Sequence, residues 1–147
     1  MHWFESQLAE LNKLADDYLQ SQQQPSANIV NASETIRNKR NQFMTAVQNL
    51  VDTVGKIKGI SACAAYHDGL ILAQSQNMPA IDAFGATVQD SVRAARQGGA
   101  MLGLGDIEQI VIVGATNKVA MLNVGPLVLC ISSPKQINLA VALSQAV

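Results

Sequence analysis

Short apolar runs joined by tight, glycine-containing turns fill the chain after Gly59, and they restrict its fold more than any other feature. The turn His67-Asp68-Gly69 separates the first two runs, and an Asp-Gly pair suits the positive φ angles of a tight hairpin. Hairpins make neighbouring strands antiparallel, so the sequence predicts an antiparallel sheet of five strands. The expected strands are residues 60–66, 70–74, 107–113, 119–124 and 127–131.

Apolar residues at helical spacing precede, divide and follow these strands. Residues 2–20 carry such a stripe from Phe4 to Tyr18, and the polar segment 21–26 after them contains Pro25 and is typical of a linker. Further helices are expected from Ser33, as the N-cap, to Gly59, over residues 80–102, and from Pro134 onwards.

The order from residue 33 is helix, two strands, helix, three strands and helix. This order predicts an α+β domain over residues 33–147, in which helices flank a five-stranded antiparallel sheet, with an N-terminal helix and linker in residues 1–32. Charged side chains make up 14% of the chain, and residues 59–147 contain only nine of them. A compact unit with so few charges exposes apolar surface, which is typical of a protein that assembles with a partner.

Composition also excludes several classes of function. The net charge is −1 and the chain has no large surplus of Lys and Arg, so we expect no nucleic-acid binding. Two cysteines and two histidines are too few for a disulfide scaffold, and all four would have to converge to form a metal site. No apolar run is long enough to cross a bilayer, and the N-terminus lacks an export pattern. We therefore expect a cytoplasmic protein without membrane insertion.

The sequence contains no pattern that points to a catalytic site. The chain has no G-x-x-x-x-G-K-[S/T] pattern, so it is not itself a GTPase of that type. His67 lies in a turn, where hydrogen bonding within the hairpin is the ordinary expectation. Cys63 and Cys130 lie in apolar strands and are expected to be small core residues. We expect no catalytic residue, cofactor or metal, and hence no enzyme.

The helix expected over residues 80–102 has two different faces. One is apolar, runs from Ile81 through Val92 to Leu102, and is typical of a core face. The other mixes small and polar residues, which suits packing on another polypeptide. For its arginines, Arg93 and Arg96, two interpretations are open: contact with another chain, or pairing within the helix with Gln89 or Asp90. The second face contains Asp82, Ala86, Gln89, Arg93, Arg96 and Ala100.

Four short motifs stand at matching places in this order of elements. They are Gly59-Ile60-Ser61-Ala62, His67-Asp68-Gly69-Leu70-Ile71-Leu72-Ala73, Gly103-Leu104-Gly105-Asp106-Ile107-Glu108-Gln109-Ile110 and Leu127-Val128-Leu129-Cys130-Ile131. With them, residues 42–146 resemble the Roadblock family, dimeric modules named after dynein light chains and found as partners of small GTPases. The resemblance implies a profilin-like α-ββ-α-βββ-α fold, and the helix of residues 2–20 lies outside the family core.

The resemblance also implies a homodimer. In such proteins the third strand, here residues 107–113, lies at the sheet edge and pairs with its copy, while the long helices pack across the two-fold axis. An apolar edge strand left alone is an aggregation hazard, and pairing of two copies removes it. The alternative is an interior strand covered by its own chain. The residues expected at the dimer interface are Ala86, Gln89, Arg93, Ile107, Gln109, Ile110, Val111 and Val113.

Bacterial members similar to the MglB proteins act with a Ras-like GTPase, and some stimulate its GTP hydrolysis. The resemblance therefore implies a non-enzymatic homodimer that binds a small Ras-like GTPase and modulates its nucleotide cycle. The residues expected to contact this partner are Asp82, Gln89, Asp90, Arg93, Arg96 and Gln97.

Two other functions are open: a dimeric adaptor without a GTPase, and a small-ligand sensor, which requires a sizeable cavity with convergent polar groups. Three partners are open for the helix of residues 2–20: the second helix of its own chain, the dimer mate, or another molecule.

Overall fold

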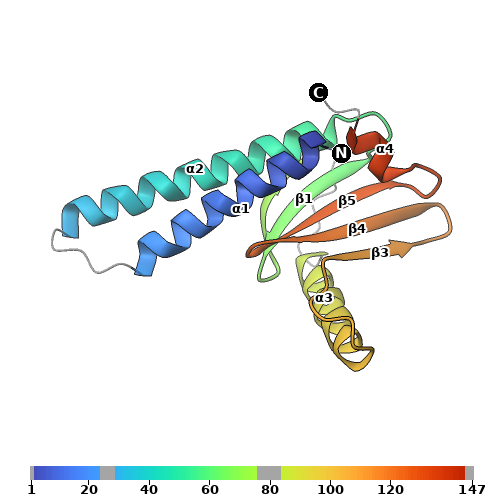
Figure 1. Cartoon of the computed structure of the whole chain (residues 1–147). Coiled ribbons are helices and arrows are strands. Elements are labelled where there is room, and N and C mark those ends of the chain that lie inside the picture. Colours follow the sequence, from blue (N-terminus) through green and yellow to red (C-terminus); the bar gives the residue numbers. More distant parts are fainter. Residues whose placement is uncertain (1, 24–28, 76–83, 145–147) are drawn as a thin grey trace.

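The computed structural model describes residues 2–23, 29–75 and 84–144 and contains the predicted order of elements (Figure 1). An additional helix precedes that order, as expected. The elements are α1 (His2–Gln23), α2 (Ile29–Gly55), β1 (Ala62–His67), β2 (Leu70–Gln74), α3 (Phe84–Met101), β3 (Gln109–Val113), β4 (Asn117–Val124), β5 (Leu127–Pro134) and α4 (Leu139–Ser144).

Some predicted boundaries are wrong. Ser33 is not an N-cap, because α2 already begins at Ile29. The same helix ends at Gly55, before the predicted end at Gly59. Pro134 ends β5 rather than opening a helix: a turn follows, in which the Ile137 N–H donates to Pro134 O at 3.2 Å, and α4 begins at Leu139. The N atom of Pro134 is on the side of β1, whose pairing with β5 ends at Ser132, so the missing N–H removes no bond of the sheet. Residues 21–23 were predicted as linker but belong to α1. The rest of the predicted linker, residues 24–26, and the start of the helix predicted from residue 80 lie outside the described residues.

The five strands form one antiparallel sheet in the order β2-β1-β5-β4-β3. The β1–β2 hairpin turns at Asp68 and Gly69, whose φ angles of 50° and 80° are those of the predicted tight turn. Within the described part of the chain, β3 pairs with β4 alone. The alternative in which residues 107–113 form an interior strand is therefore wrong.

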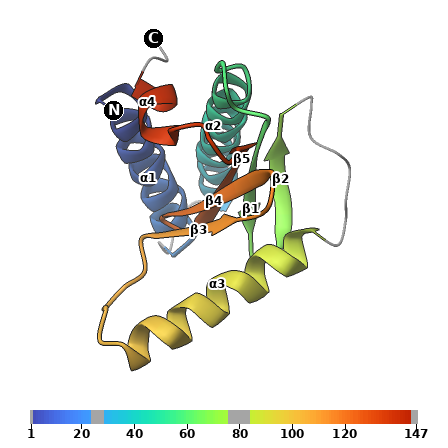
Figure 2. The same cartoon turned by 90° about the vertical axis from the view of Figure 1, so that its right-hand side faces the viewer.

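The two faces of the sheet are covered unequally (Figures 1 and 2). On one face α2 packs on β1 and β2, and α1 packs on α2, β4 and α4. Their shared core includes Phe4, Val51 and Ile131, all at most 2% exposed. The other face carries α3, whose Val88 and Val92 pack in a smaller cluster. That cluster also contains Ala64, Tyr66, Met121 and Cys130.

Helix α1 packs on α2 of its own chain, which confirms the first of the three alternatives for it. The rings of Tyr18 and Phe43 stack with their centroids 6.1 Å apart. At the other end of α1, Phe4 is buried beside the half-buried Trp3. Gly125, with φ at +57°, lies so close to α1 that a Cβ atom there would stand 2.6 Å from Asn12 Oδ1. Close packing at this glycine brings α1 against the β4–β5 turn.

Candidate partner-binding face

The outer edge of β3 presents backbone groups that no described strand pairs. Two hydrogen bonds bracket its ladder with β4: Asn123 N–H to Glu108 O, at 3.2 Å, and Gly114 N–H to Asn117 O, at 2.7 Å. Bonded pairs alternate along an antiparallel ladder, so the even-numbered residues of β3 bond to β4 and the odd-numbered ones direct their N–H and C=O groups outward. The outward residues are Gln109, Val111 and Val113.

Exposed apolar side chains lie along this edge and at the C-terminal end of α3. Val111, Ile112 and Val113 in β3 are 44%, 50% and 60% exposed. Leu102 was expected in the core but is 76% exposed, because α3 extends beyond the sheet at its C-terminal end (Figure 1). The exposed side chains at that end of α3 are Met101, Leu102 and Leu104.

The loop before β3 is held against α3 by Ile107. A Cβ atom at Gly99 would stand 2.4 Å from Ile107 Cδ1, so the missing side chain at Gly99 makes room for Ile107. The Asn123 side-chain amide donates to Ile107 O at 2.6 Å. Ile107 is half-buried and precedes β3, which begins at Gln109. The sequence predicted that Ile107 belongs to the strand. A hollow of about 650 Å³ opens beside this loop, lined in part by Arg96.

Five of the six residues that were expected to contact a partner lie on the second face of α3. Gln89, Asp90, Arg93, Arg96 and Gln97 are all exposed. The ion pair between Arg93 Nη1 and Asp90 Oδ1 is 3.7 Å long, and both side chains are more than half exposed, so it contributes little stability. Asp82 lies outside the described residues, and Ala86 lies near the start of α3.

A hollow of about 260 Å³ separates this face of α3 from the sheet. The valines Val88, Val92 and Val128 line its apolar part. Its α3 wall consists of Gln89, Arg93, Arg96 and Gln97. Its opposite wall consists of the β1–β2 turn, with Asp68 and Gly69, and of Pro126 in the β4–β5 turn. The structure thus brings four predicted partner-binding residues to one wall and adds a second wall that the sequence did not indicate.

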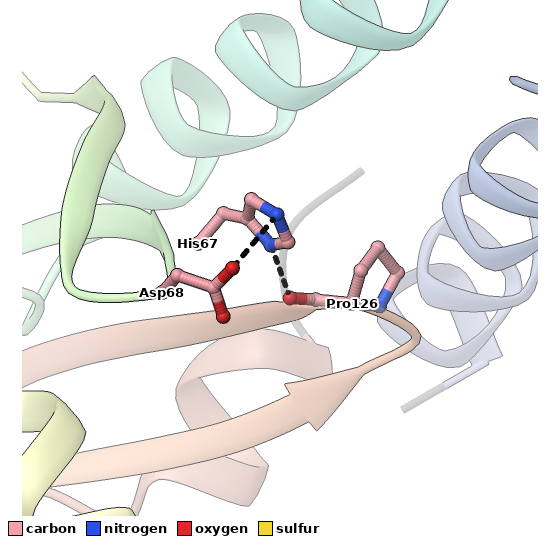
Figure 3. Close-up of polar contacts among 3 residues, drawn as sticks. All are labelled: His67, Asp68 and Pro126. Carbon is pink, nitrogen blue, oxygen red and sulfur yellow. Dashed lines mark hydrogen bonds and ion pairs between the residues drawn. The ribbon is translucent and has the colours of Figure 1, made fainter. Parts of the chain in front are cut away.

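His67 joins the two turns of that second wall (Figure 3). Its Nδ1 lies 3.0 Å from Pro126 O, and because a carbonyl only accepts, Nδ1 carries the proton. Its Nε2 lies 3.4 Å from Asp68 Oδ2. Hydrogen bonding within the hairpin was expected; the bond to Pro126 reaches another hairpin, because the Tyr66–Val128 pairing places both turns at one end of the sheet.

The cysteines are core residues, as predicted. Cys63 faces the α1–α2 side of the sheet and Cys130 faces α3, and both are free thiols. Burial raises the pKa of the Cys63 thiol and raises that of Cys130 to about 12, so neither is a reactive nucleophile at neutral pH. Burial likewise raises the pKa of Tyr66 to about 12.

Two further findings concern only residues 2–23, 29–75 and 84–144. None of their helices combines the length and the apolar character that crossing a bilayer requires. No group of three or more His, Cys, Asp or Glu among them is arranged to hold a metal ion.

The family model of the Roadblock/LC7 domain matches residues 45–133, and the chain belongs to this family. A search of the curated proteins finds no match. MglB from Myxococcus xanthus is similar in structure, with a TM-score of 0.60 and 16% identity over 70% of this chain and 83% of that one.

Two further solved structures share the fold. The Roadblock/LC7 domain from Streptomyces avermitilis has a TM-score of 0.56 and 17% identity over 64% of this chain and 82% of its own. An MglB with a tetrameric arrangement has a TM-score of 0.55 and 15% identity over 70% of this chain and 79% of its own. Identities this low show a common fold: the five-stranded antiparallel sheet flanked by helices.

Proposed function

We propose that this chain is a non-enzymatic regulatory module that forms a homodimer through β3 and α3 and binds a small Ras-like GTPase. The observation that carries the proposal is the outer edge of β3, where outward N–H and C=O groups stand among exposed apolar side chains. A second copy related by a two-fold axis pairs these groups and covers this surface. Membership of the Roadblock/LC7 family and the likeness to MglB structures support the proposal.

Within the dimer, the residues of β3 have different roles. Gln109, Val111 and Val113 direct their backbone groups at the second copy and form the pairing edge. Ile110 bonds to β4 and Ile107 packs on α3, so these two support the edge from behind. The resemblance assigned Gln89 and Arg93 both to the two-fold contact and to the GTPase contact; we propose that the α3 turn around Ala86 packs across the two-fold axis and that Gln89 and Arg93 face the GTPase.

The GTPase binds the polar face of α3 in this proposal, through Asp82, Gln89, Asp90, Arg93, Arg96 and Gln97. A binding protein without catalytic groups changes a nucleotide cycle by its differential affinity for the GDP and GTP states of its partner. Residues 33–147 form the Roadblock domain in this proposal, and residues 1–32 form an appended helix and linker. A cytoplasmic location stays a prediction.

Two proline substitutions test the dimer. Val111→Pro removes an N–H that points away from β4, whereas Ile112→Pro removes one that bonds to β4. Size-exclusion chromatography with light scattering should show a wild-type dimer and a folded Val111→Pro monomer, and Ile112→Pro should unfold at lower denaturant concentration. A wild type that stays monomeric at all concentrations, or a Val111→Pro protein that stays dimeric, contradicts pairing through β3.

A pull-down tests the partner. The probes are purified Ras-like GTPases of the organism that encodes this chain, each loaded in turn with GDP and with a non-hydrolysable GTP analogue. The proposal expects capture with a preference for one nucleotide state. Capture of neither state contradicts GTPase binding and favours the dimeric adaptor.

A further inference from the structure

The hollow between α3 and the two turns is lined by two arginines, and Arg96 has no ion pair within the described residues. Arg93 and Arg96 lie one helical turn apart on the same wall. Asp90 lies 3.7 Å from Arg93, and within the described ranges Arg96 has no ion pair. The carboxylate on the opposite wall, that of Asp68, is 79% exposed and forms no ion pair with Arg93 or Arg96. Arg96 is therefore the cation that an incoming anion meets.

We infer that this hollow accepts an acidic side chain, Glu or Asp, from the surface of the protein that docks on α3. The inference deepens the proposed function, on which it rests, by naming the group that the partner contributes. A guanidinium presents a planar fork of N–H donors that matches the two oxygens of a carboxylate. The valines at the base of the hollow contact the methylene groups of the same side chain.

The openness of the hollow favours a side chain over a free ligand. Sites for small molecules bury about 70–90% of the ligand surface. Here the Arg93 side chain is 63% exposed and that of Asp68 is 79% exposed, so the two walls leave one side in water. A side chain that belongs to a docked protein brings its own cover. This argument also weakens the small-ligand sensor, despite the convergent polar groups.

The second wall is held in place before any partner arrives. Gly69, with φ at +80°, allows the tight β1–β2 turn, and the bond from His67 Nδ1 to Pro126 O ties this turn to the β4–β5 turn (Figure 3). A wall that does not have to be ordered on binding reduces the entropic cost of association.

Docking changes the strength of the arginine contacts. An exposed ion pair such as Arg93–Asp90 contributes almost nothing, because water solvates both groups. When a partner covers Arg96 and excludes water, the charge-assisted hydrogen bonds to its carboxylate strengthen. Arg96→Gln keeps a polar side chain but removes the charge and the guanidinium fork, so it should weaken binding of the partner about tenfold.

Capped amino acids test the chemistry of the hollow without any partner protein. N-acetyl-glutamate amide and N-acetyl-glutamine amide differ in one group, and each is titrated into the intact protein at constant ionic strength. The free compound lacks the cover that a docked protein brings, so we expect weak binding: at high concentration the glutamate compound should shift the Arg93 and Arg96 Nε–H and the Gly69 N–H NMR signals saturably, and the glutamine compound should not. In Arg96→Gln the shift at Gly69 should be lost. Lys135→Gln removes an exposed cation outside the lining of the hollow and should leave all three shifts unchanged.

The outcomes separate this inference from the proposed function. Saturable glutamate shifts without capture of a GTPase support the acidic-group site and contradict the GTPase. Capture of the GTPase with equal affinity by wild type and Arg96→Gln supports the proposed function and overturns the inference. Equal shifts with the glutamine compound, or no shift at Arg93 and Arg96, also overturn it.

Discussion

The two faces of the sheet use apolar residues in opposite ways. Under α1 and α2, large side chains such as Phe4, Leu11 and Val51 are fully covered by their own chain. On the side of α3 the cluster is small, and the helix is followed by an exposed Leu104. Both regions are apolar, so composition alone does not distinguish them. The difference is whether a second layer of the same chain lies over the apolar side chains.

Helix α1 accounts for much of this difference. It adds a second layer over α2, β4 and α4, and it exposes charged side chains such as Glu5, Glu10 and Lys13 on its outer surface. Beyond α3 and β3 no described element of the chain provides such a layer. The comparison therefore predicts that the α1–α2 face contributes stability and that the α3–β3 face contributes association.

The sharpest test of this comparison is one chemical change made on both faces. Leu11→Ala empties a site that is 3% exposed and should reduce the free energy of unfolding by about 2–5 kcal/mol. Leu104→Ala removes the same atoms from a site that is 64% exposed and should change it by at most about 0.5 kcal/mol. Urea denaturation measures both values.

Light scattering on the same two variants completes that test. Leu104→Ala should dimerise more weakly, whereas Leu11→Ala should dimerise normally once it is folded. Similar losses of stability in the two variants would show that the α3 end is as closed as the α1–α2 face, and the comparison would then be wrong.

The sequence predicts those parts of the structure that depend on residues close together in the chain. The Asp68-Gly69 turn and the polar–apolar periodicities indicate the strands, the helices and the two faces of α3. The pairing of β1 with β5 joins residues far apart in the chain, and no local pattern encodes it. The bond between His67 and Pro126, 59 positions apart, and the second wall of the hollow follow from that pairing and were missed. Leu102 was misplaced because its stripe continues past the point where the sheet ends.

Alkaline pH tests the two faces through one thiol on each. Burial raises the pKa of Cys130 from 9.0 to about 12 and also raises that of Cys63. Above the unfolded value of 9.0 the unfolded chain loses protons that the folded chain keeps, so stability falls as the pH rises from 9.0 towards 12. At about pH 10 each thiol should remove about 1.4 kcal/mol, and at neutral pH none.

Denaturation at neutral pH and at about pH 10 measures this loss, and the double variant Cys63→Ala, Cys130→Ala should lose less. A thiol-specific reagent applied to the native protein then compares the faces. Cys130, beneath α3, should react before Cys63, because the thinner cover opens locally at lower cost. Faster reaction of Cys63 would contradict the closed character of the α1–α2 face.

Neighbouring glycines in α3 test how the open face is held together. Gly99→Val places atoms where Ile107 now lies and should destabilise the fold by about 1–3 kcal/mol, releasing the loop before β3. Gly98→Ala meets nothing within 4 Å and should stabilise α3 by about 0.5–1 kcal/mol. Thermal unfolding compares the pair, and equal effects would contradict the contact between Ile107 and Gly99.

Arg93→Glu should have the smallest effect on stability and still affect function. Its ion pair with Asp90 spans 3.7 Å between exposed side chains, so the free energy of unfolding should change by about 0.5 kcal/mol or less. The same change reverses a charge on the wall of the hollow, so binding of the GTPase in the pull-down should weaken. Unchanged binding would remove Arg93 from the contact surface, and a large loss of stability would mean that the face it occupies is part of the core.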